Sequence, residues 1–330
     1  MKYAALLLLI LPPLASAGEI IKITKTKEEI EFRLGDALVT RYHIGEKVAK
    51  PYFWPLHAKG DITVTRAWPM KEGDAQETKD HVHQKSAWFC HGDVIPEGIE
   101  VKAKIAHVDG VDFWSETPGH GKIVCVEVSE PKGASVTTKN EWRTPEGVKI
   151  LDETRTITLK EVGDARLMIL DIDLLASVCN ITFGDTKEGS MGVRVHDRLR
   201  VEGGIGQFQN AEGKIVDPAS YKTTKDGPIW GLKSLWCDYS GKVEDKPCGI
   251  ALFDDPKNKY PASWHARGYG LMAANPFGRN KSGFPDQKGK TDLVKLTKGE
   301  HLTLRYGILL HPGDTKTGKV ADAFAVFSGK

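Results

Sequence analysis

Polar and apolar residues alternate along most of this chain, and a period of two is the pattern of strands that bury one face. The alternation is clearest near the end, where Leu302, Leu304 and Tyr306 fall on the face opposite Thr303 and Arg305. We expect strands at residues 20–24, 28–33, 61–66, 99–106, 121–129, 134–142, 154–160, 166–174 and 302–311, and one short helix at 320–327. Many strands joined by Gly, Pro, Asp and Asn turns favour a sandwich or a barrel. We therefore predict an all-β fold, a large two-sheet β-sandwich with long loops over one face.

The first seventeen residues have the features of a secretory signal peptide. Lys2 is followed by a short apolar run at 4–11 and by Ala15-Ser-Ala17, a small-residue cleavage site. The run is too short to span a bilayer, which takes about 20 residues. An uncleaved anchor is the alternative. We expect a signal peptide at 1–17, one domain at 18–330, no integral membrane segment after cleavage, and a periplasmic or secreted protein.

The charge balance argues against a nucleic-acid-binding protein, and the cysteine spacing argues against a disulfide framework. The 46 Lys and Arg residues nearly balance the 44 Asp and Glu residues, whereas a nucleic-acid-binding protein normally carries a basic stripe. The five cysteines form no CxxC pair. Cys237 with Cys248 is the first disulfide to test, but buried free thiols are the favoured interpretation, because a chain of this length can build its own core.

Three histidines lie within eleven residues, at His81, His83 and His91. On an extended strand His81 and His83 would project from the same face, which suits acid–base work near neutral pH or metal ligation. Asp80, Asp93, Glu188 and His265 are candidates to complete a metal site. The alternatives are a divalent zinc or calcium site and histidines that only satisfy loop carbonyls.

Polar residues elsewhere follow or occupy strand-like segments. Glu188 is the leading carboxylate for acid–base chemistry, and the glycines on both sides of its turn indicate close backbone approach; a salt-bridged surface turn is the alternative. Trp264, His265 and Arg267 combine an aromatic platform, an imidazole and a guanidinium, as in a carbohydrate cleft, although a Trp in a sandwich is by default core. Our predicted catalytic residues are His81, His83, Glu188 and His265, and our predicted substrate-binding residues are His91, Lys187, Arg194, Asp238, Trp264, Arg267 and Asn275. The segment 279–290, rich in Lys and Gly, is expected to be a mobile surface loop.

Five runs of sequence carry a family resemblance, at residues 50–55, 79–89, 183–189, 236–241 and 274–278. They resemble a family of exported bacterial proteins that bears the label "methane oxygenase PmoA", over nearly the whole mature chain. The long apolar helices of a methane monooxygenase subunit are missing, so we do not expect that activity. More distantly, the chain resembles the galactose-mutarotase-like supersandwich of aldose epimerases and of domains of sugar-cleaving enzymes. That resemblance implies a His acid and a Glu base, here His81 or His83 with Glu188, although the mutarotase base lies late in the chain and 302–311 contains no Glu.

The sequence therefore predicts an exported carbohydrate-active enzyme that hydrolyses, eliminates from or epimerises a sugar by His/Glu acid–base chemistry. Other hydrolase, nucleotide and metalloprotease motifs are not found in the sequence. The alternative function is a non-catalytic carbohydrate-binding protein of the cell envelope.

Overall fold

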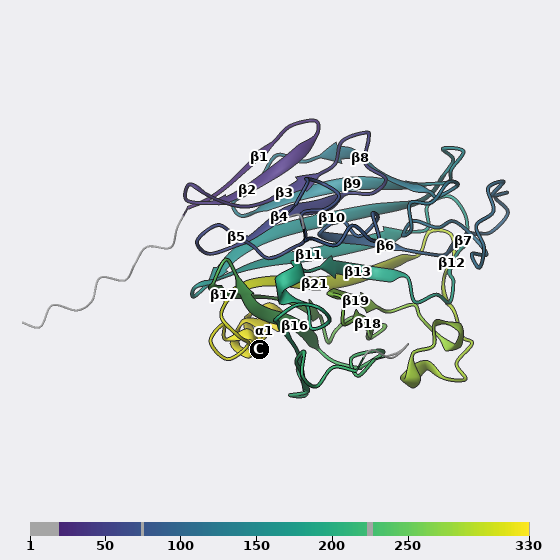
Figure 1. Cartoon of the computed structure of the whole chain (residues 1–330). Coiled ribbons are helices and arrows are strands. Elements are labelled where there is room, and N and C mark those ends of the chain that lie inside the picture. The colour runs from purple at the N-terminus through teal and green to yellow at the C-terminus, as the bar shows by residue number, and fades with distance from the viewer. Residues whose placement is uncertain (1–19, 74–75, 223–226, 330) are drawn as a thin grey trace, which may run out of the picture.

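Two antiparallel sheets, each of nine strands among the described residues, face each other and form most of the molecule (Figure 1). The computed structural model describes residues 20–73, 76–222 and 227–329, so the expected signal peptide lies outside the described residues. The first sheet has the order β1-β2-β3-β4-β6-β13-β19-β18, with β5 paired to β4. Its strands are β1 (Ile21–Lys25), β2 (Glu29–Leu34), β3 (Ala37–His43), β4 (Tyr52–Ala58), β5 (Ile62–Thr63), β6 (Ala87–His91), β13 (Gly189–Arg194), β18 (Ser263–Arg267) and β19 (Leu271–Asn275).

The second sheet has the order β15-β14-β16-β17-β21-β11-β10-β9-β8, and a small sheet has the order β20-β12-β7. The strands of the second sheet are β8 (Lys122–Val128), β9 (Ser135–Arg143), β10 (Lys149–Val162), β11 (Ala165–Leu175), β14 (Gln207–Asn210), β15 (Ile215–Val216), β16 (Trp236–Val243), β17 (Lys246–Asp254) and β21 (His301–Pro312). The small sheet consists of β7 (Val94–Pro96), β12 (Ile181–Phe183) and β20 (Val294–Leu296). Short 3₁₀ turns are η1 (Asp197–Leu199), η2 (Asn280–Ser282) and η3 (Pro285–Gln287), and α1 (Val320–Ser328) is the α-helix of the described residues.

The core lies between the two sheets because each strand turns alternate side chains inward. The Phe89 ring of β6 packs against Trp142 of β9 and Tyr306 of β21, with both centroid separations 6.1 Å. The opposite face of the second sheet is covered in part by α1. There Phe253 of β17 contacts Phe324 at 5.4 Å between ring centroids. Both faces of the second sheet are therefore buried where α1 covers it, which explains the nearly unbroken apolar run at the start of β11.

The predicted all-β sandwich is confirmed, as are most of its strands and the short helix. The predicted strand at residues 99–106 is wrong. Val101 and Ile105 do turn inward between exposed lysines, but the segment makes no sheet pairing. The predicted strand 61–66 shortens to Ile62–Thr63. None of the helices in the described part of the chain is both long and apolar enough to cross a bilayer.

The segment 279–290 lies at the surface, as predicted, and some of its residues also pack against the molecule. The two carboxylate oxygens of Asp185 accept hydrogen bonds from the backbone N–H groups of Arg279, Lys281 and Ser282, at 2.6, 2.5 and 3.0 Å. Phe284 is 1% exposed. The lysines and glycines of the segment are exposed, and the Asp185 carboxylate and the buried Phe284 ring attach it beside the turn that carries Glu188.

Candidate functional site

A cavity of about 410 Å³ collects side chains from several loops on the first sheet. That size lies in the range of small-molecule pockets, roughly 300–1,000 Å³. The loop before β6, the turn between β12 and β13, and β18 each contribute residues that the sequence analysis singled out. The lining includes His81, His83, Gln84, Trp114, Ser115, Lys187, Glu188, Glu202, Tyr221, Ile229, His265, Arg267 and Tyr269.

Strand β18 supplies two of the polar side chains through its alternation. His265 and Arg267 share one face of the strand, and Trp264 must point to the other. Trp264 is fully buried in the core, where its Nε1–H donates to the Ser234 carbonyl at 2.9 Å. The predicted aromatic platform is therefore not Trp264. Arg267 instead lies over the ring of Trp230, with its guanidinium carbon 3.7 Å from the ring centroid.

His265 is a buried imidazole with a defined tautomer. Its Nδ1 lies 2.8 Å from the Lys187 carbonyl oxygen, and because a carbonyl only accepts, Nδ1 carries the proton and Nε2 has the free lone pair. Burial, together with the positive charges of Lys187 and Arg267, holds the pKa of His265 well below its usual value. The ring is therefore neutral and can accept one hydrogen bond from a ligand.

The turn that carries Glu188 approaches its neighbours closely, as its flanking glycines predicted. A Cβ added to Gly92 would lie 2.7 Å from the Cβ of Glu188, and one added to Gly189 would lie 2.4 Å from Nδ1 of His91. Side chains other than Gly at either position would push the turn away. The Glu188 carboxylate contacts the Lys187 ammonium and lies 3.8 Å from Nδ1 of His265.

Asn275 hydrogen-bonds to the backbone of the same turn and does not line the cavity. Its Nδ2 donates to the carbonyls of Thr186 and Lys187, at 3.0 and 3.1 Å, and its Oδ1 accepts from the N–H groups of Phe277 and Gly278. All of its near polar contacts are thus with backbone. Asn275 therefore holds the turn at 186–187 to the backbone at 277–278, whereas the sequence predicted that it would contact a ligand.

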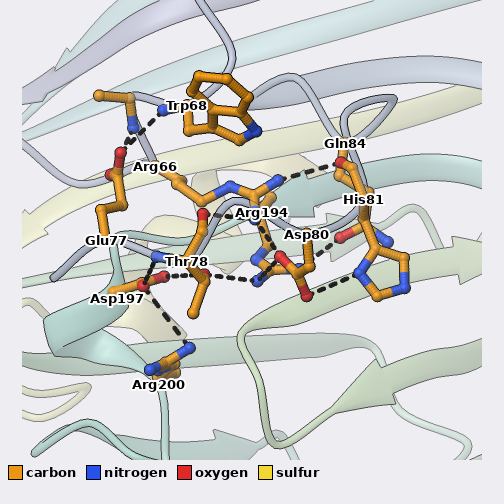
Figure 2. Close-up of polar contacts among 11 residues, drawn as sticks. Arg66, Trp68, Glu77, Thr78, Asp80, His81, Gln84, Arg194, Asp197 and Arg200 are labelled. Carbon is orange, nitrogen blue, oxygen red and sulfur yellow. Dashed lines mark hydrogen bonds and ion pairs between the residues drawn. The ribbon is translucent and has the colours of Figure 1, made fainter. Parts of the chain in front are cut away.

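His81 and His83 are adjacent in space, but a turn brings them together, and not the extended backbone on which they would share a face. Their ring centroids are 5.7 Å apart. His81 has a φ of 44°, which is unusual for a residue with a side chain, and its ring stacks on Tyr269 at 5.2 Å. Figure 2 shows the ring at the edge of a polar network that includes Asp80 and Arg194. Burial and the charge of Lys50 lower the pKa of His83 to about 4, so its ring is neutral.

Trp114 lines the cavity and belongs to an aromatic wall that extends behind it to Trp88. The Trp88 ring lies over Gly192, where a Cβ would come within 2.8 Å of it, and Trp114 packs on Trp88 at 5.0 Å between centroids. Trp114 is in turn roughly parallel to His265, at 6.2 Å. The buried ammonium of Lys50 donates to the Trp114 carbonyl at 2.9 Å and fixes this wall.

Three further predicted residues lie outside the cavity lining. His91 is fully buried, its Nε2–H donates to the Gly184 carbonyl at 2.9 Å, and burial lowers its pKa to about 4. Asp238 belongs to the second sheet, where it pairs with His311 at 2.6 Å. Arg194 lies behind the cavity, its guanidinium carbon 4.6 Å from the Tyr269 ring centroid.

Several lining residues were missed by the sequence analysis. Gln84 sits inside the histidine-rich run and could have been included on that ground. Glu202 and Tyr221 come from the connection between β13 and β16, which carries no pattern that would place them beside β18. For the metal alternative, no three His, Cys, Asp or Glu side chains within 20–73, 76–222 and 227–329 are grouped as metal ligands. All five cysteines are free thiols, so the Cys237–Cys248 disulfide is not formed.

A family model described as "Family of unknown function (DUF6807)" matches residues 29–325, and the chain therefore belongs to that family. That description names no activity, so the resemblance to the family labelled methane oxygenase stays a prediction. No curated protein matches the chain.

Several solved structures have a related arrangement of strands, at low similarity. A galactose mutarotase-like protein from Clostridium acetobutylicum has 9% identity and a TM-score of 0.42, covering 89% of this chain and 99% of that one. The α-galactosidase AgaB from Geobacillus stearothermophilus has 10% identity and a TM-score of 0.46, covering 90% of this chain and 42% of that one. A doubly substituted α-galactosidase AgaA from the same organism, in complex with stachyose, has 8% identity and a TM-score of 0.42, covering 88% and 42%. This chain therefore spans less than half of either galactosidase. Likenesses at this level carry no argument about function, and the proposal below depends on the cavity.

Proposed function

We propose that this member of the family is a carbohydrate-active enzyme, which uses the cavity beside β18 for acid–base chemistry on a sugar or glycoside. The observation that carries the proposal is that polar side chains from separate segments meet at one cavity. Three imidazoles, two carboxylates and a guanidinium from four distant segments line one cavity that also has aromatic side chains. Charged and imidazole groups are costly to bury without a use or a partner, and aromatic faces suit the C–H faces of sugar rings.

The roles follow from the chemistry of each group. Glu188 is the general base, and His81 or His83 exchanges the second proton of a hydrolysis, elimination or epimerisation. His265, neutral and with a free Nε2, accepts from a sugar hydroxyl, and Arg267 donates to another. Trp114 and Tyr269 give the ring its apolar surface. We also propose that residues 1–17 direct export and are removed, so that the enzyme acts in the periplasm or outside the cell.

The test is product formation by the purified mature chain on panels of glycosides and oxidised keto-glycosides, followed by mass spectrometry. Glu188→Gln should reduce turnover by roughly 10²–10⁴-fold, the usual contribution of an acid–base group. Glu161→Gln, an exposed glutamate on the β10–β11 hairpin, is the matched control and should leave turnover unchanged. Equal rates for both variants would remove Glu188 from the mechanism.

A non-catalytic carbohydrate-binding protein is the second candidate. The lowered pKa values of His83 and His265 favour it, because neutral imidazoles suit hydroxyl contacts without any chemistry. Saturable sugar binding by calorimetry, with no product on any panel and with affinity unchanged in Glu188→Gln, would select this function over the enzyme.

A further inference from the structure

The carboxylate of Asp80 lies between two guanidinium groups and the ring of His81 (Figure 2). One oxygen, Oδ1, accepts hydrogen bonds from Arg66 and, at 2.9 Å, from Arg194. The other oxygen, Oδ2, lies 2.7 Å from Nδ1 of His81. The two arginine side chains are fully buried, whereas the imidazole is 41% exposed and lines the cavity. Asp80 thus connects the interior to the edge of the site.

The local charges keep Asp80 ionised. Its partial burial acts to raise the pKa, but the hydrogen bond with His81 and the positive charges of Arg194 and Arg66 outweigh it and hold the pKa well below its usual value. An ionised carboxylate only accepts hydrogen bonds. Nδ1 of His81 must therefore be the donor, and the neutral ring keeps its lone pair on Nε2.

Two other contacts orient the same ring. Tyr269 stacks on His81 with an interplanar angle of 11°, and Arg194 covers the same tyrosine at 4.6 Å. The backbone of His81 is in the left-handed region, which is costly for residues other than Gly. Its carbonyl accepts from Arg66 Nη2 at 3.1 Å and from the Gln84 N–H at 2.9 Å, and these bonds stabilise that conformation.

We propose that Asp80 is a positioning residue for His81: it fixes the Nδ1–H tautomer and the ring orientation, so that only Nε2 exchanges protons with the substrate. The inference rests on the proposed function, in which His81 is an acid–base group. When Nε2 takes a proton from a substrate hydroxyl, the imidazolium remains hydrogen-bonded to Asp80 through Nδ1–H. The same proton then leaves from Nε2 to the departing oxygen or the product, so that neither Asp80 nor Nδ1 changes its protonation. This division of labour is the general one for a carboxylate that orients a working histidine.

The first test needs no substrate. Protein labelled with ¹⁵N-histidine is studied by long-range ¹H–¹⁵N NMR at alkaline pH, where imidazoles are neutral, and His81→Gln assigns the resonance by its disappearance. The wild type should show a single Nδ1–H tautomer for His81, and Asp80→Asn should convert it to a mixture. Lys79→Ala is the control, because its exposed ammonium contacts Glu72 and not His81. A wild-type ring protonated on Nε2, or an unchanged tautomer in Asp80→Asn, would overturn the proposal.

The second test applies once a substrate is known. Asp80→Asn should lower kcat, by up to about 10⁴-fold as when the orienting Asp of a catalytic triad is replaced by Asn, with KM nearly unchanged, and Asp80→Glu should recover part of it. If Asp80→Asn does not fold, the wild-type tautomer alone still decides. Because the spectra do not depend on turnover, a protein without sugar activity would contradict the proposed function and leave the test of Asp80 intact.

Discussion

Two of the His–Asp pairs among the described residues have nearly equal, short separations, and only one of these two borders the cavity. Asp80 and His81 are 2.7 Å apart at the cavity edge of the first sheet, and Asp238 and His311 are 2.6 Å apart inside the second. Both side chains of the second pair are fully buried. Burial acts to lower the pKa of His311, but the Asp238 charge and hydrogen bond outweigh it, so the pKa is raised.

The difference lies in what surrounds each pair. Two buried arginines share the Asp80 carboxylate and leave His81 stacked on an aromatic ring beside a cavity. No arginine ion pair to Asp238 is found among the described residues, and its histidine is enclosed by Gly249 and Gly318, where any Cβ would touch the ring. The pair of residue types is therefore not a functional signal by itself. Access and the neighbouring charges decide whether it can serve chemistry or only the fold.

The largest effect expected from this comparison is on turnover at the accessible pair. His81→Gln should reduce kcat by roughly 10²–10⁴-fold with little change in the melting temperature, because the side chain is 41% exposed. His301→Gln is the matched control, since this exposed histidine pairs with Asp173 at 2.9 Å on the other sheet. Steady-state kinetics and thermal melts of both variants make the comparison. Equal activity of His81→Gln and His301→Gln would contradict the claim that the pair at the cavity takes part in catalysis.

The buried pair should respond in the opposite way. Asp238→Ala removes one member of a buried ion pair and should lower the free energy of unfolding by about 3–5 kcal/mol, whereas kcat of the folded fraction should stay unchanged. Asp173→Ala, in the exposed pair with His301, should cost only about 0–1 kcal/mol. Urea denaturation measures both. A loss of kcat in folded Asp238→Ala would place that pair in the mechanism after all.

Acid should weaken the fold through the neutral histidines near the cavity. Unfolded His83 binds a proton below about pH 6.5, but in the folded chain its pKa is about 4. Its contribution to stability is therefore complete above about pH 6.5 and lost as the pH falls toward 4. His311, with its raised pKa, has the opposite sign: its contribution is present at acidic pH and lost as the pH rises through the folded value. The free energy of unfolding of His83→Gln, measured by denaturation at a series of pH values, should fall less steeply with acid than that of the wild type. An identical slope would show that His83 is not held neutral.

The smallest effect concerns binding without chemistry. Arg267→Lys loses the planar contact with Trp230 and should raise KM by about two- to thirtyfold, since cation–π contacts contribute roughly 0.5–2 kcal/mol. The value of kcat should be retained. Arg198→Lys, at an exposed position, serves as the control. A large fall in kcat with constant KM would instead give Arg267 a part in the transition state.

The fold was predictable because alternation is a local signal that burial enforces, as in β9 to β11 and β21. Residues 99–106 show its limit, since the sequence records which side chains turn inward but not whether a partner strand is present. His81, His83, Glu188 and His265 meet at one cavity as their residue types indicated. Trp264, Asn275 and Asp238 could not be placed, because the strand parity and the sheet that decide which way each side chain points depend on contacts distant in sequence.

A crystal structure of Glu188→Gln with a sugar taken from the substrate panels would test the central claim most directly. We expect the ring in the cavity beside β18, with a hydroxyl on Nε2 of His265, Nε2 of His81 facing a reacting oxygen, and Trp114 or Tyr269 against a C–H face. A sugar bound only on another surface, with this cavity holding solvent, would contradict the account.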